Sequence, residues 1–227
     1  MNSNTSNIIY HEKQIRELCA LHALNNLFQS RDAFTKSELD LICYSLSPDH
    51  WINPHKSILG LGNYDINVIM KALQSRGCEA IWFDKRKDPS CLNLNKICGF
   101  ILNVPSDYKI SFITLPLRRK HWVTIRDIAG LFYNLDSKLD NPLLIGRFQD
   151  NDLLNYLRDE LDCIEKQLFL VVTEEAAKDH TWLCDGNNYM NTTGIINSRD
   201  SDIVPLSDIN NDQFINFPVE NSYQYQS

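Results

Sequence analysis

The sequence predicts an α+β fold, because helical patterns fill the first part of the chain and strand patterns follow them. Its 227 residues, 43% of them hydrophobic, suit a single domain with a sizeable core. No run of about 18 apolar residues indicates a membrane-spanning helix. Residues 1–7 lack the basic and apolar stretches of a secretory signal, so we expect neither a span nor a leader.

Three amphipathic helices are expected first. One begins near Leu18, after which leucines recur in steps of three. The second begins after Thr35, because Thr35–Glu38 has the form of a capping box. The third spans about 65–76, and Gly77 is placed as its C-terminal cap.

Strand patterns follow the third helix. Segments 78–83 and 99–104 are both mostly apolar, and Pro105 is expected to end the second of them. A further helix is expected over 151–161. It leads to segment 167–172, whose uninterrupted apolar run predicts a strand in the centre of the sheet.

A β-hairpin is expected in the middle of the chain. Its strands are His121–Asp127, which alternates between faces, and Leu131–Asp136. The turn residues Ala129 and Gly130 separate them. In a tight hairpin His121 and Asp136 can therefore come close together at one edge of the sheet.

The chain changes character beyond about Trp182. It becomes rich in Asn, Asp and Ser and shows neither helical nor strand periodicity. We therefore expect a folded domain over residues 8–184 and a polar, disordered tail over 185–227.

Composition restricts the class of function. A formal net charge of −7 argues against a nucleic-acid-binding protein, which would usually present a basic face. The seven cysteines show no C-x-x-C spacing, which predicts free thiols in a reducing compartment. We expect the cytoplasm, with the nucleus as a further location. Zinc at Cys19 and His22, or at Cys91 and Cys98, is disfavoured because the usual paired spacing is missing.

Cys19 is the candidate nucleophile. A thiol at a helix N-terminus lies near the positive end of the helix dipole and near unpaired amides, and both favour the reactive thiolate. The same amides can stabilise an oxyanion. Gln14 lies five positions earlier. Its side-chain amide can also donate to the oxyanion if the chain folds back over the start of the helix. Composition alone still favours a buried, inert cysteine and a surface glutamine.

Two histidines compete for the role of base. His22 lies on the same helix face as Cys19, which leaves little room for a substrate and favours a supporting role. His121 begins a predicted strand, and Trp122 beside it can exclude water. Asp136 can hold the imidazole in the correct tautomer. Taken alone, the His-Trp pair favours a structural strand residue that is half in the core.

These segments, taken in order, resemble the Josephin-domain deubiquitinases. Tyr10–Gln14 and Leu18–Leu27 resemble the N-terminal signature of that family. His121–Arg126 resembles the segment with its catalytic histidine, and Tyr133–Leu139 resembles the segment with the third member of its triad. The likeness spans residues 9–182.

The short members of the family are more similar to this chain than the ataxin-3 branch is. Leu115–Lys120 precedes His121 as it does in the short members, and no ubiquitin-interacting helix pattern follows the domain. Asp136 stands where ataxin-3 carries asparagine and where the short members carry aspartate. A carboxylate stabilises an imidazolium more than an amide does.

The resemblance implies a papain-like fold, in which a helical part carrying the cysteine packs on an antiparallel sheet carrying the histidine. It implies a deubiquitinase that cleaves (iso)peptide bonds after the C-terminal glycine of ubiquitin through an acyl-enzyme. The implied roles are nucleophile for Cys19, base for His121, third triad member for Asp136 and oxyanion donor for Gln14. The expected partners are ubiquitin and ubiquitinated proteins, bound by a monomer without metal or cofactor.

Two other classes of function stay open from sequence. The chain can be a ubiquitin-binding module with little or no hydrolysis, although the set Cys19, His121 and Asp136 argues against this. It can also be a thiol transferase that passes its acyl group to an amine instead of water. Cleavage assays separate the first alternative, and product analysis separates the second.

Overall fold

The computed structural model of the chain describes residues 9–15, 17–50, 53–56, 62–110 and 113–184. The predicted tail over 185–227 therefore lies outside the described residues. Among those that are described, no helix has the length and apolar character needed to cross a membrane.

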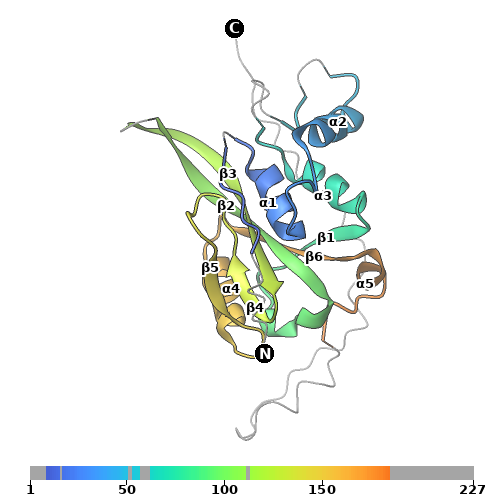
Figure 1. Cartoon of the computed structure of the whole chain (residues 1–227), viewed down its shortest axis with the longest axis vertical. Helices are drawn as coiled ribbons and strands as arrows, with labels where there is room; N and C mark the ends of the chain where they lie inside the picture. The colour runs from blue at the N-terminus through green and yellow to red at the C-terminus, as the bar shows by residue number, and fades with distance from the viewer. Residues whose placement is uncertain (1–8, 16, 51–52, 57–61, 111–112, 185–227) are drawn as a thin grey trace, which may run out of the picture. The chain divides into compact units, whose positions relative to one another are not determined.

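A six-stranded antiparallel sheet forms the centre of the fold, with helices on both of its faces (Figure 1). The strand order is β1-β6-β2-β3-β4-β5. In chain order the strands are β1 (Cys78–Trp82), β2 (Ile97–Ile110), β3 (Ile113–Ile128), β4 (Leu131–Asn134), β5 (Leu143–Arg147) and β6 (Gln167–Thr173). The helices are α1 (Cys19–Phe28), α2 (Lys36–Leu46), α3 (Ile66–Gln74), α4 (Asp152–Asp162) and α5 (Glu174–Lys178). The predicted α+β class is therefore confirmed.

Two hydrophobic cores lie on the two faces of the sheet. Alternate residues of β6 contribute side chains to the two cores. Phe169 and Val171 pack with α1, α2 and α3, whereas Leu168 and Leu170 pack with α4. A strand buried on both faces needs apolar residues at every position. This explains the uninterrupted apolar run, and the prediction of a central strand is confirmed.

Pro105 does not end its strand, so that prediction is wrong. β2 continues to Ile110 and stays paired with β3, where Pro105 lies opposite Lys120. Its pairing with β6 ends at Asn103. Pro105 therefore lies on a stretch of β2 with one partner strand, and proline is tolerated at such an edge.

The capping box of α2 is present as predicted. Thr35 Oγ1 accepts a hydrogen bond from the Glu38 amide at 3.2 Å, and the Glu38 carboxylate accepts one from the Thr35 amide at 2.7 Å. The third predicted helix is also present as α3, and Gly77 has a positive φ of 69° just beyond it. The sequence signals did not reveal β5 or α5.

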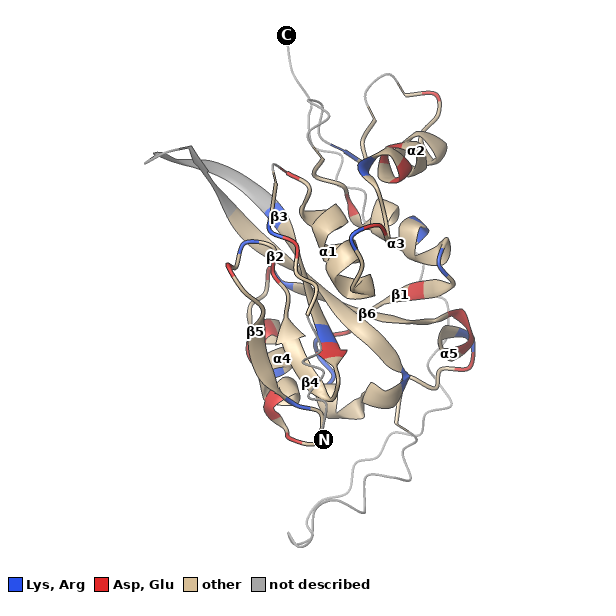
Figure 2. Ribbon diagram, viewed as in Figure 1, with Lys and Arg blue, Asp and Glu red and all other residues tan. Residues whose placement is uncertain are grey.

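Helix α1 lies directly on β3 and β2. It carries no Asp, Glu, Lys or Arg and is buried from Cys19 to Leu27 (Figure 2). The buried hydroxyl of Thr124 in β3 donates a 2.6 Å hydrogen bond to the carbonyl oxygen of Ala23. Gly99 in β2 lies so close that a Cβ there would be 2.5 Å from Cδ1 of Leu27. The helix that carries Cys19 is thus fixed against the strand that carries His121.

Gly99→Ala should lower the free energy of unfolding by about 1–3 kcal/mol, because the added methyl group overpacks a buried contact. Urea denaturation of wild type and variant measures the change. In a Leu27→Ala background the methyl group has room, so the same substitution should cost less there. An equal cost in both backgrounds would contradict the steric explanation.

Candidate active site

Cys19 is the first residue of α1, as predicted, and is 5% exposed. The residue before it, Leu18, provides no side-chain cap for the helix. A polar N-cap side chain would usually accept hydrogen bonds from amides in the first turn. The thiol therefore lies at the positive end of a helix whose N-cap residue does not accept from those amides.

His121 lies between Cys19 and Asp136. Its Nε2 is 2.6 Å from Asp136 Oδ1, and the Cys19 side chain lies near enough to the ring to contribute to its raised pKa. Because Asp136 engages Nε2, Nδ1 is the nitrogen left for the sulfur. The ring is 3% exposed. The structure therefore brings together the three residues that the sequence selected from distant parts of the chain.

Opposing effects act on the pKa values of His121 and Asp136. Burial lowers the pKa of His121, but the hydrogen bonds and charges of Asp136 and Cys19 outweigh it, so the net pKa is raised. Burial raises the pKa of Asp136, but its hydrogen bond and ion pair with His121 outweigh that effect and lower it. The arrangement thus favours an imidazolium beside a carboxylate.

The hairpin that delivers Asp136 is the predicted one. Ala129 and Gly130 have positive φ values of 55° and 83°, as a two-residue turn of type I′ requires. β4 ends at Asn134, however, so Asp136 lies in the following loop and not in the predicted strand. The amide of Leu135 still donates to the carbonyl oxygen of Thr124 at 2.8 Å, which keeps this loop beside β3.

Asn134 holds Asp136 in place, and sequence reasoning missed it. Its Oδ1 accepts from the Asp136 amide at 2.9 Å, and its Nδ2 donates to the hydroxyl of Tyr156 in α4 at 3.0 Å. Asp136 repeats the pattern, because its Oδ1 accepts from the Lys138 amide at 2.8 Å. The available signal was two Asx residues spaced by two, which is the spacing of successive Asx turns.

A segment before α1, Tyr10–Ile15, lies beside the loop that carries Asp136; we call it the strap. Its Gln14 amide donates to the carbonyl oxygen of Ser137 at 2.7 Å, and His11 Nε2 donates to that of Asp136 at 2.9 Å. Asn26 of α1 donates to the carbonyl oxygen of Leu135 at 2.9 Å. Three consecutive carbonyl groups of the loop are therefore bound by the N-terminal part of the chain.

His22 does not take the place of His121. Its Nδ1 is 2.6 Å from Glu12 Oε2, and its Nε2 accepts from the Ile15 amide at 3.1 Å. Both ring nitrogens therefore face the strap, which leaves neither for Cys19. Sequence reasoning found His22 but missed Glu12. The available signal was an acidic residue in the segment just before the helix that carries this histidine.

Trp122 is a core residue. Its indole N–H donates to the carbonyl oxygen of Tyr64 at 2.9 Å, and its ring lies 6.1 Å from that of Phe169. It is 3% exposed and packs in the core that also contains Cys19. Its place fits the expectation of a bulky apolar neighbour that limits water around the site.

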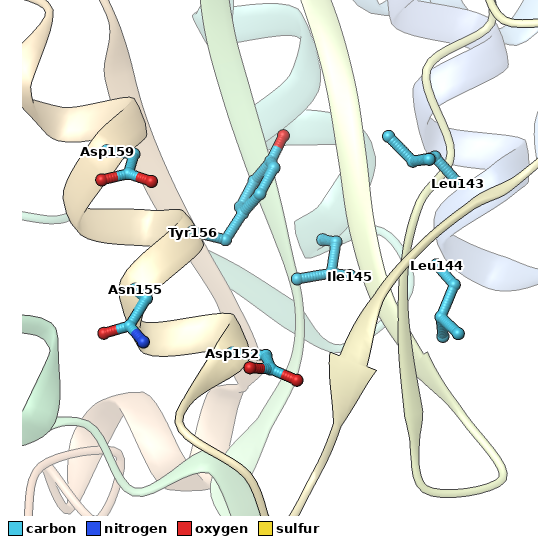
Figure 3. A pocket seen from close by; sticks show the side chains of 7 residues that line it. All are labelled: Leu143, Leu144, Ile145, Asp152, Asn155, Tyr156 and Asp159. Atoms are coloured by element: carbon cyan, nitrogen blue, oxygen red, sulfur yellow. The ribbon is translucent and has the colours of Figure 1, made fainter.

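Two surface grooves differ in their relation to the site. One lies between β5 and α4 and contains none of the predicted site residues (Figure 3). The other is lined by Lys13, Gln14 and Ser137–Asp140, so it runs from the strap along the loop that follows Asp136. Within the part of the chain that the structure describes, no cluster of three or more His, Cys, Asp or Glu is arranged to hold a metal ion.

Comparison with known proteins identifies the family of the chain. The family model of Josephin matches residues 14–171. A Josephin-like protein of Drosophila melanogaster is 55% identical over 168 residues, which cover 74% of this chain and 75% of that protein. Josephin-2 of Homo sapiens is 46% identical over 175 residues, which cover 77% of this chain and 92% of Josephin-2. A buried Cys-His-Asp arrangement on an α+β fold thus occurs in a chain that belongs to the Josephin family.

The comparison also confirms the expected branch of the family. Ataxin-3 of Homo sapiens is 31% identical over 161 residues, which cover 61% of this chain and only 39% of ataxin-3. The likeness to Josephin-2 is higher and extends over nearly the whole of that protein. The fold is the papain-like one, with the helix that carries the cysteine packed on the antiparallel sheet that carries the histidine.

Asp136→Asn should lower the pKa of His121, because the amide lacks the charge that helps to raise it. The imidazolium should then lose its proton at a lower pH than in wild type. NMR titration of the His121 ring in both proteins measures this shift. Asp159→Asn, on the exposed face of α4, is the matched control and should leave the titration unchanged. An unchanged pKa in Asp136→Asn would contradict the electrostatic role.

Proposed function

We propose that the chain is a thiol-dependent deubiquitinase that hydrolyses the bond after the C-terminal glycine of ubiquitin. The observation that carries this proposal is the buried His121 ring, whose Nε2 is 2.6 Å from Asp136 Oδ1 and whose pKa is raised by both Asp136 and Cys19. Membership of the Josephin family, whose N-terminal signature and two later segments the chain resembles, supplies ubiquitin as the substrate. The catalytic unit is residues 8–184.

The first half of the reaction forms an acyl-enzyme. The Cys19 thiolate attacks the glycine carbonyl carbon, and the carbonyl electrons move to its oxygen. When the tetrahedral intermediate collapses, the C–N bond breaks and the His121 imidazolium gives its proton to the leaving amine. The products of this half are the free amine and a thioester between Cys19 and ubiquitin.

The second half hydrolyses the thioester. Neutral His121 accepts a proton from water, whose oxygen attacks the thioester carbonyl. Collapse expels the Cys19 thiolate and releases ubiquitin with a free carboxylate, while His121 is again protonated. In both halves the first-turn amides of α1 and the Gln14 side chain stabilise the oxyanion. Asp136 orients the ring and stabilises its charge.

The groove lined by Gln14 and Ser137–Asp140 suits the leaving group. The leaving amine must lie near the group that protonates it, and the groove follows the loop of Asp136, the partner of His121. We therefore place the lysine-bearing side of the conjugate in this groove. The seven cysteines are all free thiols, which supports a reducing compartment such as the cytoplasm or nucleus.

A ubiquitin derivative with a C-terminal electrophile tests the proposal. Wild type should form a covalent adduct, and Cys19→Ala should form none, because Cys19 is the thiol that interacts with the His121 imidazole. Cys98→Ser is the matched control, because Cys98 is an exposed thiol outside the site. It should react as wild type does.

Cleavage and binding of diubiquitin distinguish the hydrolase from the binding module and the transferase. His121→Ala should lose nearly all cleavage of diubiquitin while retaining its binding. No adduct in wild type, or an adduct in Cys19→Ala, would show that the nucleophile is wrongly assigned. Binding of diubiquitin without cleavage by wild type would indicate a binding module, and transfer of ubiquitin to an added amine in preference to water would indicate a transferase.

A further inference from the structure

A half-buried carboxylate on the strap, that of Glu12, has no part in the proposed chemistry. Glu12 accepts hydrogen bonds from His22 Nδ1 at 2.6 Å, from Asn25 Nδ2 at 3.1 Å and from the Tyr10 hydroxyl. Its own amide donates to Asn26 Oδ1 at 2.7 Å. Three of these partners belong to α1, so Glu12 attaches the strap to the helix that begins with Cys19.

Charge and hydrogen bonding both show that Glu12 is ionised in this place. Burial raises the pKa of its carboxyl, but the hydrogen bonds from His22, Tyr10 and Asn25 outweigh it and lower the pKa below its usual range. A half-buried carboxylate that accepts from several donors is strongly fixed in position. Glu12 is therefore a rigid acceptor for the proton of His22.

The Ile15 amide selects one tautomer of His22. The Ile15 amide donates to His22 Nε2 at 3.1 Å, so this nitrogen must be unprotonated. The ring proton therefore lies on Nδ1, where it is donated to Glu12. Without the carboxylate this tautomer would keep only the support of the Ile15 amide, and the other tautomer would direct an N–H group at that amide.

Gln14 lies between two anchors that depend on this arrangement. On one side its own amide is bound to the carbonyl oxygen of Ser137 at 2.7 Å. On the other side the next amide, that of Ile15, is bound to His22. His22 lies one helical turn after Cys19 on the same face of α1. The bond from Ile15 thus sets the position of Gln14 relative to the sulfur.

We infer that Glu12 and His22 are positioning residues of the proposed reaction, which hold Gln14 where it stabilises the oxyanion. This inference rests on the proposed function and adds two residues to it. Neither touches the reacting atoms. Their effect passes through the Ile15 amide to Gln14, so it should appear in turnover more than in substrate binding.

Steady-state hydrolysis of a ubiquitin C-terminal fluorogenic amide tests the inference. His22→Leu replaces the imidazole with an apolar side chain of similar volume, which cannot accept a hydrogen bond from the Ile15 amide. Its kcat should fall by about tenfold or more, up to the roughly 100–1000-fold loss that follows complete removal of an oxyanion donor. KM should change by less than about threefold. His22→Gln can accept from Ile15 and donate to Glu12, so it should recover most of the lost turnover.

A double-mutant cycle with Gln14→Ala distinguishes positioning from general structural damage. If His22 acts through Gln14, His22→Leu should have little further effect in a Gln14→Ala background. Glu12→Gln keeps the volume of the side chain and should give a smaller loss with the same lack of additivity. Asp159→Asn, on the exposed face of α4 and outside the strap and the site, is the control and should retain nearly all turnover.

The failures of the two proposals are distinguishable. No hydrolysis by wild type would overturn the proposed function. Hydrolysis by wild type, with additive losses for His22→Leu and Gln14→Ala, would overturn the positioning role alone. Unchanged kcat in His22→Leu, or no recovery in a folded His22→Gln, would overturn it as well. Thermal unfolding of each variant shows whether the protein is folded.

Discussion

The site depends on the direct contact between α1 and β3. The Thr124 hydroxyl binds the carbonyl oxygen of Ala23 inside the core, and Gly99 in the adjacent strand lets the helix approach closely. Because both points lie in a close-packed interior, the helix has little freedom to slide or tilt. A residue at the start of the helix, Cys19, and a residue of the strand, His121, are therefore held together by packing that neither of them supplies.

The loop of Asp136 unites the polar part of the site. Three consecutive carbonyl groups, from Leu135 to Ser137, accept hydrogen bonds from the strap and from α1. The carboxylate of Asp136 binds His121 from the other side. A single short loop thus fixes the acid, the strap and the first helix relative to one another. These hydrogen bonds explain how Gln14, more than a hundred residues before Asp136 in the sequence, can lie in the same site.

Sequence patterns predicted elements whose causes are local. A capping box defined α2, a two-residue turn defined the β3–β4 hairpin, and an apolar run defined β6. They failed where the cause is non-local. Pro105 is compatible with a strand only because of what pairs beside it, and no local pattern reveals that. Cys19, Gln14 and His121 could be selected by resemblance, whereas Glu12 and Asn134 act through side-chain hydrogen bonds whose partners only the folded chain identifies.

The proposed function requires His121 to activate Cys19 although the thiol is buried. Alkylation by limited iodoacetamide at neutral pH, followed by mass spectrometry of the peptides that contain the seven cysteines, tests it most directly. Accessibility alone favours Cys98, which is exposed, over Cys19, which is buried. We expect Cys19 to react first in wild type and to lose this preference in His121→Ala. Faster modification of Cys98 in wild type, or an unchanged order in His121→Ala, would contradict this activation.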